Sequence, residues 1–390
     1  MIKFGVDNLL QNAPIWKNNR IGLVTNKAAV TNHLLTSREA LLKNNFRICK
    51  LFSPEHGLEI EGADGHEIKD GIDKLTGLPV ISLYSNKLAP TKEDLDDLDI
   101  ILFDIPDIGS RFYTYLWTMT YVMEACATNK KKLIILDRPN PISGNLDLCE
   151  GPILNQTQSS FIGRWSMPIR HGCTLGELAL YFNAVKNSQC DLEIIACSNW
   201  DRTSFQTDWG IPLVPTSPAI QNFEAMLLYP GLCLLEATNI SEGRGIDYSF
   251  CIAGAPWING ESIAGLLNNM GFDEVIVTPL RFIPEDINGK YYKENCGGIR
   301  LTIREPRFFQ PVYFGLLLIR FVKHLYPNDF EWKPYSTLVN PIGKNHLDKL
   351  LGFENSETLF DLPLPKFIRE ITLLTQSGSW KHEIRNYLLY

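Results

Sequence analysis

The chain has 390 residues, of which 45% are hydrophobic and 21% are charged, a composition typical of a globular protein. This length exceeds what one hydrophobic core usually supports, so we expect two domains. The net charge is −7 and the basic residues are scattered, which argues against a nucleic-acid partner.

The apolar segments are short throughout the chain. None reaches the ~18 residues that a membrane span needs, so we predict no membrane span. Residues 1–7 carry no long apolar segment of a secretion signal, so the sequence predicts a cytoplasmic protein.

The nine cysteines form no C-x-x-C pair, and several lie in apolar runs. We therefore expect reduced, mostly buried thiols.

Short apolar segments alternate with helical patterns from residue 20 to about residue 200. The predicted strands are 20–26, 46–53, 79–84, 99–105, 132–136 and 192–197. The predicted helices are 37–45, 91–98, one that ends at Asn129, and 175–185. This alternation predicts an α/β fold with a doubly wound parallel sheet.

The pattern changes after about residue 225. Strands are predicted at 249–256, 275–279 and 299–303, and an amphipathic helix at 313–326. We therefore predict a first domain over 1–225 and a smaller α+β domain over 226–390.

Polar side chains follow the predicted strands of the first domain. Glu55 and His56 come directly after the strand that Pro54 ends, because proline cannot donate to a sheet ladder. In an open parallel sheet, ligands bind outside the carboxyl ends of the strands. An acid and an imidazole at that edge are candidates for proton transfer. In the alternative interpretation, Glu55 caps a turn and His56 packs locally.

Several chemistries lack their sequence signatures. The first strand is followed by T-N-K-A-A-V, without the glycine pattern of dinucleotide sites or a Walker lysine, so no nicotinamide cofactor is expected. His56, His66 and His171 could converge, but no H-E-x-x-H or paired cysteine spacing supports a metal site. The G-x-S-x-G pattern of a serine nucleophile is also absent.

Carboxylate chemistry fits the chain better. Glycoside hydrolysis needs two groups around an oxocarbenium-like centre, one of them a protonated acid. Acids in turn or strand-end contexts are Glu55, Asp107, Glu150, Glu177, Glu236 and Glu242. Side chains suited to binding a sugar are Asn26, Asn140, Asn239, Arg111, Arg170 and Tyr113. Structural alternatives stay open, since Asn239 could form a turn, Arg244 could pair with Glu242, and Tyr113 could lie in the core.

Seven short motifs occur together in a distinctive order. They are F-S-P-E-H-G at 52–57, D-I-P-D-I-G-S-R-F-Y-T-Y at 104–115, D-R-P-N-P at 137–141, E-G-P at 150–152, R-H-G at 170–172, Y-P-G at 229–231 and T-N-I-S-E-G-R-G at 238–245. In this combination the chain resembles the DUF1343 proteins, the exo-β-N-acetylmuramidases of the NamZ type. The resemblance covers nearly the whole chain.

The resemblance implies an enzyme that releases non-reducing terminal N-acetylmuramic acid (MurNAc) from peptidoglycan fragments such as MurNAc-GlcNAc. It implies a Rossmann-like domain joined to a smaller domain that closes the cleft, with no cofactor. Glu55 is then expected as the general acid, and His56 as a supporting catalytic residue. The expected substrate-binding residues are Asn26, Asp107, Arg111, Tyr113, Asn140, Arg170, His171, Glu236, Asn239, Glu242 and Arg244.

Two finer expectations concern the substrate. A muramyl sugar carries a lactyl carboxylate, which an arginine fork can hold by two hydrogen bonds. We rank Arg111 first and Arg244 second for this role, ahead of Arg138 and Arg170. The acidic, glycine-rich segment 59–73 is expected to form a lid or rim loop over the crevice.

Two other functions compete with the glycosidase. One is a non-catalytic protein that binds cell-wall glycans, which would bind a muramide without turning it over. The other is a dehydrogenase-like enzyme, which the missing glycine pattern disfavours.

Overall fold

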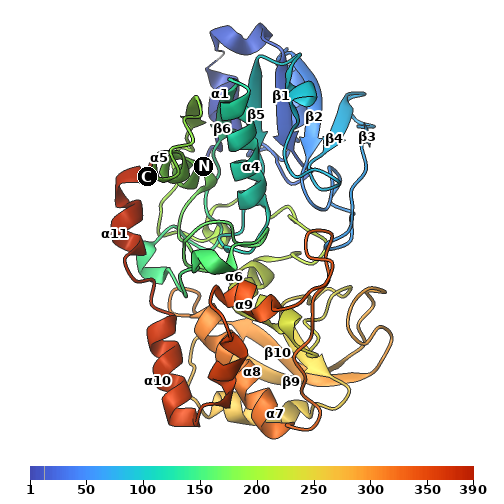
Figure 1. Ribbon diagram of the computed structural model, residues 1–390, viewed down its shortest axis with the longest axis vertical. Helices are drawn as coiled ribbons and strands as arrows, with labels where there is room; N and C mark the ends of the chain where they lie inside the picture. Colours follow the sequence, from blue (N-terminus) through green and yellow to red (C-terminus); the bar gives the residue numbers. More distant parts are fainter. Residues whose placement is uncertain (13) are drawn as a thin grey trace.

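The computed structural model describes residues 1–12 and 14–390. Two units lie one above the other along the long axis of the molecule (Figure 1). The N-terminal unit contains a seven-stranded sheet and the C-terminal unit a three-stranded sheet. This confirms the predicted α/β fold with a second, smaller α+β part.

The large sheet has the strand order β3-β4-β2-β1-β5-β6-β7. Its strands are β1 (Ile21–Thr25), β2 (Ile48–Ser53), β3 (Gly71–Ile72), β4 (Pro79–Ser82), β5 (Ile100–Asp104), β6 (Lys132–Leu136) and β7 (Leu192–Ile195). All neighbours pair in parallel except β3 and β4. The chain runs from β1 outward to β4, then returns to the other side of β1 at β5. The order therefore reverses between β1 and β5, as in a Rossmann-like sheet.

Helices cover both faces of this sheet, which explains the nearly continuous apolar strands. They are α1 (Gly5–Gln11), α2 (Ser37–Lys43), α3 (Lys92–Leu95), α4 (Tyr115–Thr128) and α5 (Leu175–Val185). Apolar side chains of α3, α4 and α5 share one core with alternate residues of the strands, such as Phe103. Those of α1 and α2 share the opposite core with the residues between, such as Leu102.

The C-terminal unit packs helices on one antiparallel sheet of order β8-β10-β9. Its elements are α6 (Phe223–Leu232), β8 (Ile252–Ala255), α7 (Gly260–Asn268), β9 (Val275–Phe282), β10 (Cys296–Ile303), α8 (Pro311–Leu325), α9 (His346–Leu351) and α10 (Leu364–Leu374). Helices α6 and α8 approach closely at Gly231, where a Cβ atom would lie 1.9 Å from the carbonyl oxygen of Pro311. Glycine in the Y-P-G motif therefore serves this packing.

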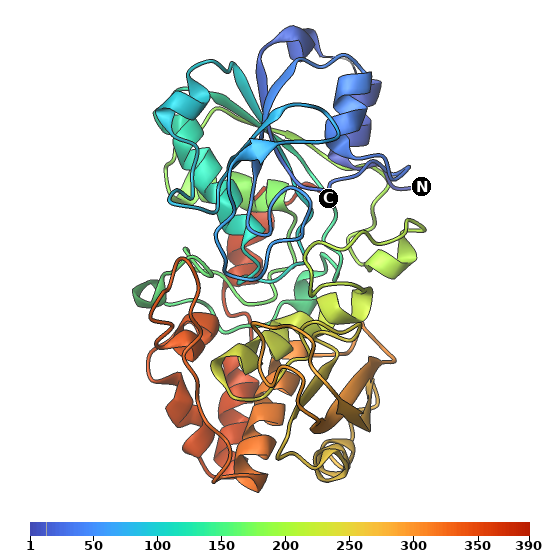
Figure 2. The ribbon, with the colours of Figure 1, turned by 90° about the vertical axis from the view of Figure 1, so that its right-hand side faces the viewer.

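The last residues of the chain return to the N-terminal unit. Helix α11 (Trp380–Ile384) lies beside α5 (Figure 1), and both views place the C-terminus against the sheet unit (Figure 2). The Trp380 indole donates to the carbonyl oxygen of His171 at 2.9 Å, and the Tyr390 hydroxyl donates to Asp137 at 2.7 Å. The division at residues 225 and 226 stays a prediction, and these contacts cross it.

The cysteines agree with the sequence analysis. All nine carry free thiols and eight are buried, with Cys49 partly buried. Among the described residues, no helix has the length and apolar character of a membrane-spanning one.

Glu150, from the E-G-P motif, links the two units. Its carboxylate accepts the backbone N–H groups of Val312 at 3.1 Å and Tyr313 at 2.6 Å, at the N-terminus of α8. Anionic groups stabilise that end of a helix. Burial raises the pKa of Glu150 to about 7.

This pKa predicts a pH dependence of stability. The pKa of Glu150 in the folded protein lies above its ordinary value. The contribution of protonated Glu150 to the free energy of unfolding is therefore fully present at pH 4.5 and below, and it is lost as pH rises through about 7. Between pH 5 and pH 8, the Tm of the wild type should fall by roughly 2–5 °C more than that of Glu150→Gln. Thermal unfolding monitored by circular dichroism measures this. Equal slopes for the two proteins would contradict it.

Candidate active site

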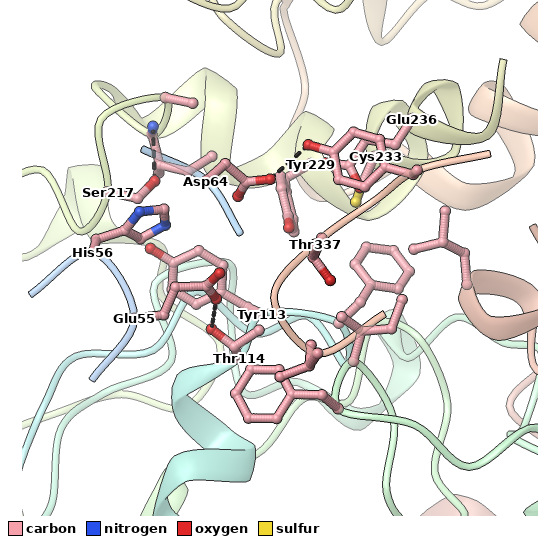
Figure 3. A pocket seen from close by; sticks show the side chains of 18 of the residues that line it. Glu55, His56, Asp64, Tyr113, Thr114, Ser217, Tyr229, Cys233, Glu236 and Thr337 are labelled. Carbon is pink, nitrogen blue, oxygen red and sulfur yellow. Dashed lines mark hydrogen bonds between the residues drawn. The ribbon is translucent and has the colours of Figure 1, made fainter. Parts of the chain in front are cut away.

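A pocket with about 590 Å³ of empty space lies between the carboxyl edge of the large sheet and the C-terminal unit (Figure 3). The N-terminal unit contributes Glu55, His56, Asp64, Tyr84, Tyr113 and Thr114, and the C-terminal unit contributes Tyr229, Cys233, Glu236, Arg244, Tyr335 and His346.

Glu55 reaches this pocket from the turn after β2. His56 (φ 65°) and Gly57 (φ 76°) both adopt left-handed backbone angles, which turn the chain back from the sheet. The Glu55 side chain is buried, and it accepts the Gly65 N–H at 3.1 Å and the Thr114 hydroxyl at 2.6 Å. Burial raises the pKa of its carboxyl, which favours the protonated form.

His56 lies beside Glu55 in the same turn. Its Nδ1 lies 2.9 Å from the carbonyl oxygen of Gly62, so Nδ1–H donates to that oxygen. The ring lines the pocket together with Glu55. Its predicted supporting role stays a prediction.

The sequence analysis did not select Asp64, although it lies in the acidic segment that was expected to cover the crevice. The Tyr335 hydroxyl donates to Asp64 Oδ2 at 2.5 Å, and Arg244 Nη2 lies 3.6 Å from the same oxygen. Burial opposes ionisation of Asp64, but Arg244 and His56 outweigh it and hold the pKa below its usual value. The pKa values of Glu55 and Asp64 are therefore shifted in opposite directions.

Arg244 forms the centre of an ionic network. It donates to Glu236 at 2.6 Å and to Glu242 at 2.9 Å, so the pairing that the sequence left open is present. Lys290 also donates to Glu242 at 2.9 Å, and the second oxygen of Glu236 lies 3.1 Å from His346 Nε2. The network fixes Arg244 at the wall of the pocket.

A larger groove adjoins the pocket, with about 1,730 Å³ of empty space. It shares Asp64, Glu236, Arg244 and Tyr335 with the pocket. The predicted site residues Asn239 and Glu242 line this groove and not the pocket.

The structure corrects the prediction that Arg111 binds substrate. Its side chain is fully buried, and its terminal nitrogens donate to the carbonyl oxygens of Pro152, Met167 and Leu350 at 2.6–2.8 Å. Burial lowers the pKa of Arg111 to about 9. Arg111 therefore braces the two units and cannot hold a lactyl group.

Two other residues that were predicted to bind substrate make hydrogen bonds within the protein instead. Arg170 is buried and donates to the carbonyl oxygens of Ile142 and Phe309, while the Asn140 amide donates to that of Cys173. In both cases the hydrogen-bond partners are backbone carbonyl oxygens of loop residues, so neither side chain is available to a ligand.

Three predicted residues lie deeper in the sheet unit. Asn26 is buried and caps the Ala28 N–H. His171 is buried, accepts the Cys173 N–H and lies 3.2 Å from Asp107, which lines a separate pocket. Of the predicted residues, the main pocket therefore brings together Glu55, His56, Tyr113, Glu236 and Arg244.

Tyr335 was missed because it lies in an irregular segment of the C-terminal unit, and His346 was missed because it begins the short helix α9. Their rings stack with centroids 4.8 Å apart. No spacing in the sequence marks them as site residues. Within the described residues, no group of three histidine, cysteine or carboxylate side chains could hold a metal ion.

Comparison with known proteins identifies the family. The family model described as "Exo-beta-N-acetylmuramidase NamZ, N-terminal" matches residues 21–224, and its C-terminal counterpart matches residues 227–390. The chain belongs to the NamZ family. It is therefore assigned to the glycosidases, which confirms the family suggested by the motifs.

Named relatives cover most of this NamZ-family chain. It is 39% identical over 353 residues to "Peptidoglycan beta-N-acetylmuramidase NamZ" of Bacillus subtilis (strain 168), a match that covers 90% of the chain and 82% of that protein. Two crystal structures of DUF1343 family proteins from Bacteroides fragilis NCTC 9343 are similar over 100% of the chain and 99% of theirs. Their TM-scores are 0.87 and 0.77, at 29% and 28% identity.

Proposed function

We propose that this chain releases non-reducing terminal N-acetylmuramic acid from peptidoglycan fragments, with Glu55 as the general acid. The observation that carries the proposal is the placement of Glu55 in the pocket between the two units, where burial favours its protonated carboxyl. A glycosidase needs such an acid to protonate the oxygen of the leaving group.

In the proposed reaction, the terminal sugar occupies the pocket and its glycosidic oxygen lies against Glu55. The Thr114 hydroxyl and the Gly65 N–H fix the carboxyl, so its orientation is set before substrate binds. As the bond to the anomeric carbon breaks, Glu55 transfers its proton to that oxygen.

Of the four arginines considered for the lactyl carboxylate, Arg244 is the one that lines the pocket. Two of its nitrogens bind Glu236 and Glu242, while Nη1 has no hydrogen-bond partner in the part of the chain that the structure describes. We therefore assign lactyl recognition to Arg244.

Arg244→Met should lower kcat/KM on a muramide by at least about 10-fold, because a charge-assisted hydrogen bond contributes ~1.5–3 kcal/mol. On a slowly hydrolysed glucosaminide, which has no lactyl group, the loss should be much smaller. Arg244→Lys, which keeps the charge but not the fork, serves as the matched variant. Equal losses on both substrates would assign Arg244 to bracing Glu236 and Glu242 alone.

The proposed function is tested by a release assay on a MurNAc-GlcNAc disaccharide, with both sugars quantified by chromatography. Turnover by the wild type and loss of turnover in Glu55→Gln are expected. The alternative is a non-catalytic protein that binds cell-wall glycans. It would bind the disaccharide, measured by calorimetry, and release neither sugar.

A further inference from the structure

Three carboxylates line the pocket, and they differ in how the protein uses their oxygens. Glu236 is bonded at both oxygens, by Arg244 and His346. Glu55 is also bonded at both, by Gly65 and Thr114. Asp64 is bonded at Oδ2, whereas its Oδ1 has no hydrogen-bond partner within residues 1–12 and 14–390. Asp64 is thus the one of the three with an oxygen that accepts no hydrogen bond from these residues, as the base that takes a proton from water requires.

The surroundings of Asp64 also suit an ionised carboxylate next to a protonated one. Its side chain is 30% exposed, so water reaches it, and it lines both the pocket and the adjoining groove. Arg244 and the Tyr335 hydroxyl lie at its Oδ2. In Figure 3, Asp64 lies above Glu55, with His56 to the side of both.

The backbone fixes Asp64 relative to Glu55. The next residue, Gly65, donates its N–H to Glu55 and accepts the Leu338 N–H at 2.8 Å from the C-terminal unit. Gly65 has φ 68°, and a Cβ there would lie 2.8 Å from Thr337 Cγ2. Only glycine fits at this point of contact, so the acidic segment is held on both sides.

We propose that Asp64 is the second catalytic carboxylate, the general base that activates the attacking water. The inference rests on the proposed function, in which Glu55 is the acid. Glu55 gives its proton to the glycosidic oxygen, and the electron pair of the C1–O bond leaves with that oxygen. The water oxygen forms the new bond to C1, and Asp64 Oδ1 takes one of its protons. One water is consumed, and exchange with solvent returns both carboxyls to their starting states.

This mechanism inverts the configuration at the anomeric carbon. The β-linked substrate should therefore yield the α-anomer of the muramyl sugar first, as followed by proton NMR within seconds of release. Initial formation of the β-anomer would overturn the assignment of Asp64 as the base.

A second test compares two leaving groups, the sugar of MurNAc-GlcNAc and an aryl alcohol in a chromogenic muramide. A good leaving group needs little protonation. On the aryl substrate, Glu55→Gln should therefore have most of the activity of the wild type. Asp64→Asn should stay at least about 100-fold below wild type on both, because either substrate needs an activated water. Glu67→Gln, which alters an exposed acid of the same segment, should match the wild type on both.

The two tests separate the proposals. If the wild type hydrolyses neither substrate, the proposed function fails. If Glu55→Gln behaves as expected and Asp64→Asn keeps more than about a tenth of wild-type activity, the role of Asp64 alone is overturned. Thermal unfolding of each variant confirms its fold. Asp64→Ala replaces Asp64→Asn if the latter is unstable.

Discussion

Glu55→Gln is expected to lower kcat on the disaccharide by about 10²–10⁴-fold, the usual contribution of a general acid. The glutamine Oε1 still accepts the Gly65 N–H, and its Nε2 can donate to the Thr114 hydroxyl, so the pocket should keep its shape. Steady-state kinetics with the released sugars as readout measures the effect, and an unchanged Tm provides the control for folding. A variant with wild-type kcat would exclude Glu55 as the acid.

The same residue predicts the alkaline side of the pH profile. Burial raises the pKa of Glu55, and the proton must be present for catalysis. The kcat/KM of the wild type should therefore hold up to this raised pKa and fall as pH rises through it. Glu55→Gln has no proton to lose at this position, so its residual activity should lack that decline. A decline that persists in the variant would belong to another group.

Arg111→Met is expected to lower the free energy of unfolding by about 3–5 kcal/mol. The substitution leaves three buried carbonyl oxygens, those of Pro152, Met167 and Leu350, without their donors. Urea unfolding measures the change. Arg369→Met is the control, since the Arg369 side chain is 69% exposed and the effect should stay within about 0.5 kcal/mol. A stable Arg111→Met variant that no longer prefers muramides would restore the role in substrate binding.

The sequence predicts the path of the main chain well because burial on both faces leaves a clear apolar pattern. The strand before Glu55 and the strand before Asp107 were predicted within two residues of β2 and β5 at their boundaries. Pro54 marks the point where the first of them stops. The edge of the sheet that carries the site follows from this pattern, and so does Glu55.

The apolar pattern does not predict the direction in which each side chain at that edge points. Arg111 follows its strand as Glu55 does, yet a partner carbonyl at Leu350 lies 239 residues away in sequence. Whether such a side chain faces a cavity or a carbonyl oxygen depends on segments that lie far away in the sequence and pack against it. Asp64 and Tyr335 come from loops and His346 begins a helix of six residues, so no periodic pattern in the sequence could bring them together.

The return of the last residues to the sheet unit has a consequence for folding during synthesis. Residues 380–390 leave the ribosome after the whole C-terminal unit has been made. Until then α5 lacks the aromatic contacts of Tyr181 with Trp380 and Tyr387, and Asp137 lacks the Tyr390 hydroxyl. Domains generally fold in the order in which they are synthesised. In this chain the unit that is made first is therefore the unit that is completed last.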